Sequence, residues 1–457
     1  MGLSLLSRSA SLRDYMPPSP LLTNAFQAFS SRVLLVNGAT TYSGADLLTR
    51  FEAVSQALAG HSGSCVICAS SEPEDVLTSL CLPAEIDVSV LFVPEYLSRE
   101  VPSLAETVGA SALIRSGAVT PIRRIGEDRK TSGPSDEVLL LTSGTGGKPK
   151  VVRHKWQTLF ARVRLSGSED ARVWLLTYLA TSFAGIQVLL TAAVAANTIV
   201  RSSSVHRETL AIGARHGVTH LSCTPTFLRS LIAAGAHETV LPRIRQVTLG
   251  GEIADQRTLD TARSHFPGAR ISHIYAATET GALFSVSDAR AGFPKSWLQN
   301  GVEDVRFKVV DDVLYVSSPR AMIAYAGADN TRVSGWIDTG DVVRVIEDRV
   351  LFMGRRDRRI NVGGSKTAPE EVERAILEVP GVADAVVTGV PSPLSGQMVL
   401  AEVVPTEAGN TEELRQRIFA HIRGCLANHQ IPRILRFRTD VPLSPSGKKS
   451  TTTQSLL

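Results

Sequence analysis

The order of apolar and polar positions divides the chain into parts with different periodicities. Through the first two-thirds, short continuous apolar runs recur, separated by stretches with helical spacing. Continuous apolar strands that alternate with helices are typical of parallel sheets covered on both faces. We expect strands at 88–93, 138–141, 173–176, 220–223, 247–249 and 271–274, and helices at 46–58, 184–195 and 226–234.

After about residue 301 the pattern changes to alternation. The segment VRFKVVDDVLYVSS alternates on both sides of Asp311 and Asp312, and VVRVIEDRVLFMG does so around Glu347 and Asp348. Apolar and polar residues that alternate on either side of a short polar pair predict a β-hairpin. We therefore expect two hairpins, each with its turn at the acidic pair.

The last hundred residues predict a smaller α+β unit. Helices are expected at 369–377 and 411–427, strands at 383–390 and 399–404, and a polar tail follows. The charged run GRRDRR at 354–359 precedes this unit and favours an exposed linker. The expected fold class is α/β: a large N-terminal domain (1–353) of mixed or parallel sheets covered by helices with a β-hairpin subdomain, a hinge (354–358), and a small C-terminal α+β domain (359–457).

Composition narrows the class of partner. The 457 residues carry a formal charge of only +4, which gives no basis for a nucleic-acid partner, and we find no apolar run long enough to span a membrane. Five scattered cysteines favour a reducing compartment, and we expect a cytoplasmic protein. Cys65 and Cys68 form a CxxC inside the apolar run CVICA, which favours a buried strand over a metal or redox site.

The strongest local chemical signal is the segment LLLTSGTGGKPK, where an apolar strand leads into a loop rich in glycine, hydroxyls and lysine. Glycines let backbone N–H groups approach an anion, hydroxyls donate further hydrogen bonds, and lysines add charge. This composition predicts a polyphosphate site, although a plain turn between strands has the same composition. An ordinary P-loop is excluded, because Thr142 and Pro149 occupy positions that it reserves for Gly and for Ser or Thr.

This loop resembles the phosphate-binding signature of the adenylate-forming superfamily, which includes acyl- and aryl-CoA synthetases, luciferase and the adenylation domains of peptide synthetases. Four further stretches match that family's signatures in the same order: YAATETG, GWIDTGD, GRRDRRINVGG and PLSPSGKK. Weaker matches are VTHLSCTPTFL and LGGE. The resemblance spans nearly the whole chain, from about residue 25 to residue 449.

The resemblance implies an enzyme that uses ATP and Mg²⁺. Thr278 would contact the α-phosphate, Glu279 would help to hold Mg²⁺, Tyr275 would lie along the adenine, and Asp341 would bind the ribose hydroxyls with help from Arg355. The other implied ATP-binding residues are Thr142, Ser143, Gly144, Thr145, Gly146, Gly147, Lys150 and Gly251. Taken alone, YAATETG also fits a helix cap, GWIDTGD fits an edge turn with a buried Trp336, and the charged residues fit simple solvation.

The resemblance also assigns roles in the C-terminal part. Lys448 is the expected adenylation lysine, with Lys449 as the fallback, because acid activation needs a cation beside two anions. Asp357 is the expected hinge about which a mobile small domain would exchange two half-reactions. Gly363 and Gly364 would line the pantetheine path, although a plain turn fits these glycines equally well.

The acyl pocket implied by the resemblance is lined by small or apolar residues: Phe183, Ile186, Gly250, Gly251, Ala276 and Ala277. His273 would contact a polar substituent of the acid. His273 also fits a structural role. Residues 183–185 offer no counter-charge for an α-ammonium group, so we expect an aryl or short-to-medium acyl acid without an α-amine.

Three functions stay open. The first is an AMP-forming acyl- or aryl-CoA ligase, the second a stand-alone enzyme that loads a separate acyl carrier protein or an amine, and the third a non-catalytic nucleotide-binding homologue. No carrier domain follows Leu457 in this sequence, so we expect the thiol to come from CoA or from the phosphopantetheine of another protein. Three departures from the family pattern, at Gly146, Asn361 and Lys366, bear on rate and on the thiol partner.

Overall fold

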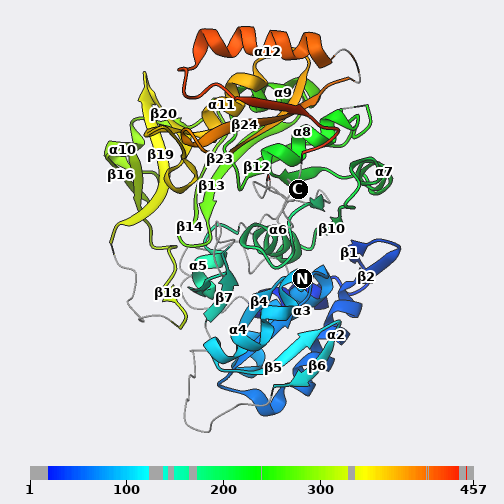
Figure 1. Cartoon of the computed structure of the whole chain (residues 1–457). Helices are drawn as coiled ribbons and strands as arrows, with labels where there is room; N and C mark the ends of the chain where they lie inside the picture. The colour runs from blue at the N-terminus through cyan, green and yellow to red at the C-terminus, as the bar shows by residue number, and fades with distance from the viewer. Residues whose placement is uncertain are drawn as a thin grey trace. The chain divides into compact units, whose positions relative to one another are not determined.

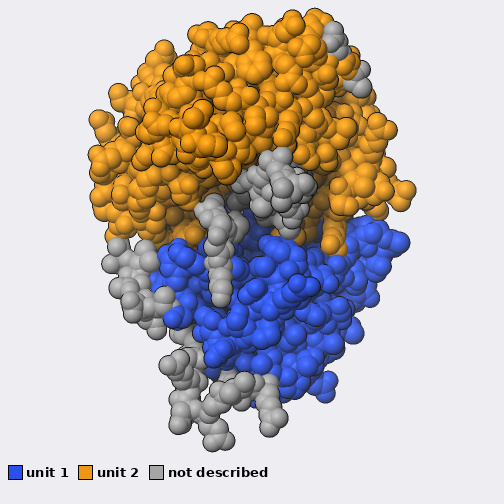
Figure 2. Space-filling model, in the orientation of Figure 1, with its two compact units in different colours: residues 1–171, 180–199, 322–331 blue, residues 172–179, 200–321, 332–457 orange. Residues whose placement is uncertain are grey.

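The computed structural model describes residues 19–122, 137–142, 149–163, 172–237, 239–327, 335–407, 409, 411–441 and 449. The chain forms two compact units (Figure 2). Unit 1 contains residues 1–171, 180–199 and 322–331, and unit 2 contains residues 172–179, 200–321 and 332–457. The predicted hinge at 354–358 falls within unit 2 and stays a prediction. Within the described ranges, no helix has both the length and the apolar character needed to cross a bilayer.

Unit 1 is built on a seven-stranded sheet with the order β18-β8-β7-β4-β3-β5-β6. Its central strands are parallel and buried, as continuous apolar runs predict. Both edges are antiparallel, so the sheet is mixed. The strands are β3 (Cys65–Ala69), β4 (Ser89–Val93), β5 (Ala110–Arg115), β6 (Ala118–Pro121), β7 (Glu137–Leu141), β8 (Val151–Lys155) and β18 (Ala324–Tyr325).

Two helices of unit 1 begin at side-chain N-caps that the sequence supplies. The helix expected at 46–58 is Gly44–Ala57, and its N-terminus is fixed by a capping box between Ser43 and Asp46. The helix expected at 184–195 is Phe183–Val194, with Ser182 as its N-cap. These two helices are α2 (Gly44–Ala57) and α6 (Phe183–Val194). The other elements are α1 (Ser19–Ala28), α3 (Pro73–Ile86), α4 (Val101–Val108), α5 (Trp156–Phe160), the short helices η2 (Ala59–His61) and η3 (Glu95–Glu100), and the hairpin of β1 (Val33–Asn37) and β2 (Thr40–Ser43). Strand β10 (Thr198–Arg201) contains the boundary between the two units at residue 199.

The CxxC lies on the fully buried strand β3, which confirms the interpretation as a core strand. Burial raises the pKa of the Cys65 and Cys68 thiols to about 12, so both are protonated at neutral pH.

Unit 2 contains a sheet in which β13, β12, β11 and β9 are parallel and β14 adds an antiparallel edge. The strands are β9 (Val173–Leu176), β11 (His220–Cys223), β12 (Gln246–Gly250), β13 (Arg270–Ala277) and β14 (Gly281–Val286), and the helices are α7 (His206–His216), α8 (Pro225–Ala233) and α9 (Gln256–His265). The helix-cap alternative for YAATETG is wrong, because residues 278–280 form the turn from β13 to β14.

The two predicted hairpins form most of a second, antiparallel sheet of unit 2, with the order β15-β20-β19-β17-β16. Asp311 and Asp312 have φ angles of 50° and 61°, the left-handed pair that a tight hairpin turn requires. Trp336 is 42% exposed, so the alternative of a buried Trp336 is wrong. The elements are β15 (Phe293–Pro294), α10 (Trp297–Asn300), β16 (Arg306–Val310), β17 (Val313–Ser317), β19 (Ile337–Ile346) and β20 (Arg349–Arg355).

The C-terminal α+β segment of unit 2 has a hydrophobic core of its own, drawn from residues 360–435. Its sheet has the order β22-β21-β24-β23, with β25 parallel to β24, and α11 contacts both β23 and α12 (Figure 1). The elements are η4 (Arg356–Arg358), β21 (Ile360–Val362), β22 (Ser365–Thr367), α11 (Pro369–Leu377), β23 (Val382–Ser392), β24 (Gly396–Pro405), α12 (Thr411–Cys425) and β25 (Ile434–Phe437). The predicted fold class is confirmed: α/β, with a large N-terminal domain of mixed sheets and helices and a smaller C-terminal domain.

Candidate functional site

Tyr275 and Asp341 join two sheets of unit 2, the parallel sheet that contains β13 and the antiparallel sheet that contains β19. Tyr275 lies near the end of β13, and its hydroxyl donates a hydrogen bond to Oδ2 of Asp341 on β19. The tyrosine ring is packed against Phe284 and Phe352, with ring centroids 5.4 and 4.7 Å away. Burial, and then the neighbouring Asp341 carboxylate, raise the pKa of Tyr275 well above its usual range. Tyr275 is therefore a neutral donor that fixes the orientation of the carboxylate.

Arg355 completes this group, and it lies opposite Asp341 in the antiparallel register of β19 and β20. Its Nη1 donates to the carbonyl oxygen of Thr339 at 3.0 Å and lies 3.5 Å from Oδ1 of Asp341, while its Nε donates to Asp357 at 3.2 Å. Burial alone would lower the pKa of Arg355, but the carboxylates of Asp357 and Asp341 outweigh burial and raise the pKa overall, so the guanidinium stays charged. We call Tyr275, Thr339, Asp341, Arg355 and Asp357 the Asp341 cluster.

Gly340 is required by the geometry of this cluster. Its φ is +70°, and a Cβ there would lie 3.1 Å from Nη2 of Arg355. A larger residue would be strained and would press on the guanidinium. The backbone N–H of Asp341 donates to the Thr339 hydroxyl at 3.1 Å, which holds the turn in place. Gly340, the second glycine of GWIDTGD, thus lets the strand approach Arg355 closely.

The chemistry of the Asp341 cluster fits a polyhydroxyl ligand. An ionised carboxylate accepts hydrogen bonds from two neighbouring hydroxyls, and an adjacent aromatic ring offers an apolar face to a base. Asp341 keeps 18% of its side-chain surface exposed and Arg355 keeps 41%, so water reaches both. This is the pair of properties that a ribose site needs.

The predicted pocket residues of unit 2 lie where parallel strands end. Gly250 ends β12, Gly251 follows it with φ of +82°, and Ala276 and Ala277 end β13, next to a register shift at Tyr275/Ala276. Thr278 and Glu279 follow in the half-buried turn to β14. Because β12 and β13 are parallel, these residues share the carboxyl edge of the sheet, the usual place for a ligand in α/β folds.

His273 is held by the protein itself. Its Nε2 lies 2.9 Å from the carbonyl oxygen of Gly292, an acceptor, so this nitrogen carries the proton. Burial lowers the pKa of His273 and keeps the imidazole neutral. This environment fits the structural role weighed for His273 better than a contact with the acid.

The predicted phosphate loop belongs to unit 1, and only its two ends are described. The backbone N–H of Thr142 donates to the carbonyl oxygen of Lys150 at 3.0 Å, so the loop closes between the antiparallel strands β7 and β8. The ammonium of Lys150 lies 5.1 Å from the centre of the Tyr325 ring. Ser143, Gly144, Thr145, Gly146 and Gly147 lie outside the described residues, as does Lys448.

Phe183 and Ile186 lie in the first turns of α6 in unit 1. Phe183 is 8% exposed and Ile186 is fully buried. The Phe183 ring is 6.0 Å from that of His154. The role of both residues in an acyl pocket stays a prediction.

Gly363 and Gly364 form the turn between β21 and β22, with φ angles of +58° and +88°. Gly363 donates its N–H to the Ser395 carbonyl at 2.9 Å, and Gly364 donates its N–H to the side chain of Asn361 at 3.1 Å. A Cβ on either glycine would meet nothing within 4 Å, so the turn is open on its outer side. Asn361, one of the departures from the family pattern, therefore has a local role as the acceptor that closes this turn.

Sequence reasoning missed a second polar cluster of unit 2. Arg229, Glu252, Glu373 and Asp384 surround Lys449, which the sequence offered only as a fallback for the adenylation lysine. The single available signal was Glu252 at the end of LGGE, of which only the glycines were assigned. We call these five residues the Lys449 cluster.

Two family models match the chain. The AMP-binding enzyme model matches residues 127–319, and the AMP-binding enzyme C-terminal domain model matches residues 371–448, which together cover more than half of the chain. The chain belongs to the adenylate-forming superfamily. The first match contains the motifs LLLTSGTGGKPK and YAATETG, and the second ends at residue 448, one residue before the end of PLSPSGKK.

Curated relatives of this chain have names that refer to different kinds of ligase and synthetase. The chain is 27% identical over 362 residues to 4-coumarate–CoA ligase-like 4 of Oryza sativa subsp. japonica, covering 72% of this chain and 64% of the rice protein. It is 25% identical over 469 residues to the fatty acid–acyl-carrier-protein ligase MmaC of Mycobacterium marinum, covering 92% of this chain and 86% of that protein. A match of 29% identity to a peptide synthetase of Salinispora arenicola spans only 4% of that protein.

Solved structures share the fold. The crystal structure of the anthranilate CoA ligase AuaEII with anthranoyl-AMP superposes with a TM-score of 0.78 at 19% identity, covering 95% of this chain and 96% of that chain. The amide bond synthetase McbA of Marinactinospora thermotolerans gives a TM-score of 0.68 at 22% identity, covering 95% and 98%. These likenesses establish the architecture alone.

Proposed function

We propose that the protein activates a carboxylic acid with ATP, releases pyrophosphate to give an acyl-adenylate, and then transfers the acyl group to a thiol, with CoA as the first candidate acceptor. The observation that carries the proposal is the Asp341 cluster. It combines a tyrosine ring, an oriented carboxylate and a guanidinium in a chain of the adenylate-forming superfamily.

The proposed roles follow the chemistry of each group. Asp341 accepts hydrogen bonds from the ribose hydroxyls of ATP, Arg355 keeps this carboxylate ionised, and Tyr275 orients it while its ring faces the base. Thr278 donates to the α-phosphate. Mg²⁺, held by Glu279 and phosphate oxygens, would supply charge neutralisation, which suits its preference for carboxylate and phosphate ligands.

Acid activation joins two anions, and this decides the role of the lysine. A carboxylate oxygen of the acid bonds to the α-phosphorus of ATP while the bond to the bridging oxygen breaks, and pyrophosphate leaves with that electron pair. The ammonium of Lys448 is proposed to stabilise the charge that spreads over the phosphate oxygens. Transfer follows when a thiolate sulfur bonds to the acyl carbon, AMP leaves, and the thiol proton passes to solvent.

For the acid, we propose an aryl or short-to-medium acyl group without an α-amine. Small residues at Gly250, Ala276 and Ala277 leave room for a flat or slender group beside the carboxyl edge of β12 and β13. The first turn of α6 carries no acidic residue to pair with an ammonium group. The named relatives, a coumarate-ligase-like protein and a fatty acid ligase, fit the same chemical range.

A carrier protein is the second candidate acceptor. The observation in its favour is the relative MmaC, named as an acyl-carrier-protein ligase, whose match covers 92% of this chain. The open turn at Gly363 and Gly364 would admit pantetheine from either source, since the same thiol arm ends CoA and a loaded carrier protein.

A pyrophosphate-exchange screen tests the proposal. Purified full-length protein is incubated with ATP, Mg²⁺ and panels of aryl, fatty and amino acids. We expect exchange with acids that lack an α-amine. Lys448→Ala should abolish exchange and leave thiolysis of a supplied acyl-adenylate largely intact. Absence of exchange with every acid would favour a non-catalytic nucleotide-binding homologue.

Product analysis identifies the acceptor. The activated acid is offered CoA, a phosphopantetheine-loaded carrier protein, or an amine, each alone. We expect an acyl-CoA thioester. Transfer only to the carrier protein or the amine would overturn CoA as the acceptor while leaving acid activation in place.

A further inference from the structure

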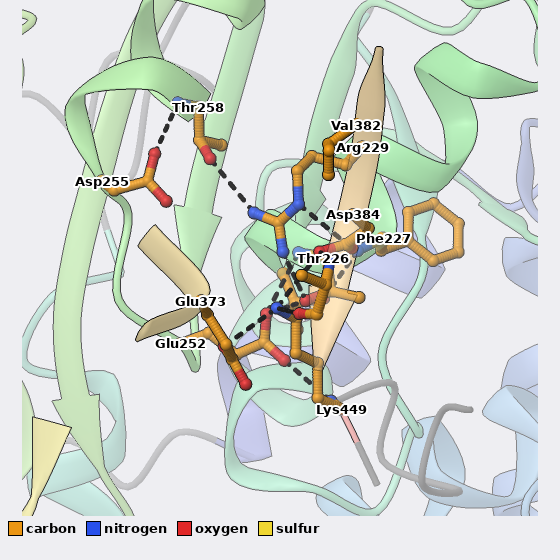
Figure 3. Close-up of polar contacts among 12 residues, drawn as sticks. Thr226, Phe227, Arg229, Glu252, Asp255, Thr258, Glu373, Val382, Asp384 and Lys449 are labelled. Carbon is orange, nitrogen blue, oxygen red and sulfur yellow. Dashed lines mark hydrogen bonds and ion pairs between the residues drawn. The ribbon is translucent and has the colours of Figure 1, made fainter. Parts of the chain in front are cut away.

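The side chain of Lys449 is buried, and oxygen atoms of Glu373, Asp384 and Ala385 surround its ammonium group (Figure 3). Its ammonium donates to Oε2 of Glu373 at 3.0 Å and to the carbonyl oxygen of Ala385 at 2.5 Å, and it pairs with Oδ1 of Asp384 at 3.1 Å. Only 10% of the lysine side chain is exposed. Three oxygen partners match the three N–H donors of an ammonium group, so this lysine is fully engaged.

The backbone of the same residue is bound to a different element. The N–H of Lys449 donates to Oε1 of Glu252 at 2.9 Å. The other oxygen of Glu252 accepts from both the N–H and the hydroxyl of Thr226, at 3.0 and 2.6 Å. Glu252 therefore links the tail at residue 449 to the first turn of α8.

Arg229 carries the network back to the C-terminal segment. Its Nε lies 3.1 Å from Oδ2 of Asp384, and its two terminal nitrogens donate to Thr226 and Thr258 at 2.9 and 3.1 Å. Asp384 thus stands between two cations, Arg229 on one oxygen and Lys449 on the other (Figure 3). A separate bond from Arg257 to the carbonyl oxygen of Val382, at 3.1 Å, joins α9 to the start of β23 nearby.

The charges of the cluster hold one another in the ionised state. Burial would lower the pKa of Lys449, but Glu373 and Asp384 raise it overall. Burial would likewise raise the pKa of Asp384, but the charges of Arg229 and Lys449 lower it overall. The cluster is therefore an ionic contact at neutral pH.

The cluster joins two parts of unit 2 that the chain connects only at residues 354–358. Glu373 and Asp384 belong to the C-terminal segment with its own core, whereas Arg229 lies on α8 and Glu252 lies in the bend that follows β12. Glu252 directly follows Gly251, and Lys449 directly follows Lys448 in the sequence. The bond between Lys449 and Glu252 therefore joins two positions that each lie next to a residue with a proposed role: Lys448, the adenylation lysine, and Gly251, a nucleotide-binding glycine.

An ionic contact suits a junction that has to form and release. The desolvation cost of a buried ion pair nearly offsets its attraction, so the net stabilisation is small while the required geometry is strict. An apolar residue at 449 would bind by surface area alone and would tolerate many orientations. A lysine held by three directed partners sets one orientation.

We propose that Lys449 is the positioning residue for acid activation: by bridging Glu252 to Glu373 and Asp384, it holds the C-terminal segment against α8 and the bend after β12 in the arrangement used for adenylate formation. This inference rests on the proposed function. It assigns Lys449 no contact with ATP or the acid. The thiol-transfer step does not need the bridge.

The test separates the two half-reactions of the full-length enzyme. Lys449→Met keeps the length of the side chain and removes the charge. We expect adenylate formation, followed in single turnover, to slow by roughly 10- to 100-fold, in line with the cost of misplacing a reacting group by about 1 Å. The KM values for ATP and acid, and the rate of thiolysis of a supplied acyl-adenylate, should change by no more than about threefold.

Two further variants distinguish positioning from general loss of structure. Lys449→Arg retains a cation and should restore part of the rate. The double variant Lys449→Met/Glu373→Gln removes the charge left unpaired and should recover the thermal stability of the wild type, yet adenylate formation should stay slow. Lys295→Met removes an exposed lysine in the turn after β15 and should behave as the wild type.

Three outcomes would overturn the inference: an unchanged adenylation rate in Lys449→Met, equal loss of both half-reactions, or full recovery of the adenylation rate together with stability in the double variant. Failure of the proposed function gives a different result, because the wild type itself would then catalyse no pyrophosphate exchange with any acid.

Discussion

The Asp341 cluster and the Lys449 cluster have the same ingredients, carboxylates and cations, but differ in their access to water. Arg355 and Asp357 keep 41% and 44% of their side-chain surfaces exposed, whereas Lys449 and Asp384 keep 10% and 5%. In the first cluster a tyrosine ring and a carboxylate border solvent. In the Lys449 cluster, the two cations bind carboxylates and a carbonyl oxygen of the protein itself, away from water.

This difference in exposure distinguishes a cluster that can bind a ligand from one that fixes the arrangement of the protein. A partly exposed ion pair contributes little to stability and can exchange a water or a protein partner for a ligand group at small cost. A buried pair loses several kcal/mol if one partner is removed, because the other is left charged without water. This difference supports the proposed roles, ligand binding for the Asp341 cluster and positioning for the Lys449 cluster.

The largest expected effect is on stability. Asp384→Ala removes the carboxylate between Arg229 and Lys449 and should lower the free energy of unfolding by about 3–5 kcal/mol. Urea denaturation measures this change. As a control, Asp348→Asn breaks an exposed pair with Arg290 and should leave the unfolding midpoint almost unchanged. A loss below about 1 kcal/mol in Asp384→Ala would place both clusters in the same class.

The next effect is on activity. Asp341→Ala removes the proposed ribose acceptor and should slow ATP-dependent pyrophosphate exchange by roughly 10²- to 10³-fold, the range found when an oriented polar group in an active site is lost. Asp338→Asn changes an aspartate on the same strand that pairs with the exposed Arg356, and it should retain most of the activity. Nearly normal exchange in Asp341→Ala would remove the Asp341 cluster from the nucleotide site.

A smaller effect is expected from Tyr275→Phe, which removes the hydroxyl bound to Asp341 and keeps the ring. A hydrogen bond to a charged group contributes about 1.5–3 kcal/mol, so the KM for ATP should rise by roughly tenfold or more. The KM for the acid should stay close to that of the wild type. Steady-state kinetics with each substrate varied in turn gives both values, and equal increases in the two would argue against a nucleotide-specific role.

The smallest expected effect is a change in acid sensitivity. The folded-state pKa of Asp384 is lowered, since the charges of Arg229 and Lys449 outweigh burial. Its contribution is therefore fully present above the unfolded-state pKa of about 3.9 and is lost as the pH falls through the lowered value. Between about pH 5 and pH 3, the stability of the wild type should fall more steeply than that of Asp384→Asn. Urea denaturation at several pH values tests this, and parallel curves would contradict it.

Local patterns were sufficient for many of the buried strands, for the two hairpins and for several helices. Continuous apolar runs predicted β9 and β11 with their observed bounds, and alternation around Asp311 and Asp312 predicted the hairpin of β16 and β17. The antiparallel edges β8 and β18 were not predicted. Strand β8 is a short mixed segment, and the two residues of β18 pair with it from more than 160 positions later in the chain, so neither has a recognisable period.

The sequence by itself determined the fold class, the family and the residue types of the Asp341 cluster, because strands, turns and family motifs are properties of neighbouring residues. Only the tertiary structure decided which charges meet. Lys449 and Glu252 are 197 positions apart, and neither has a local pattern that marks its partner. Whether a lysine is a mobile surface charge or a buried bridge depends on what the fold packs around it, and that packing is set by the whole chain.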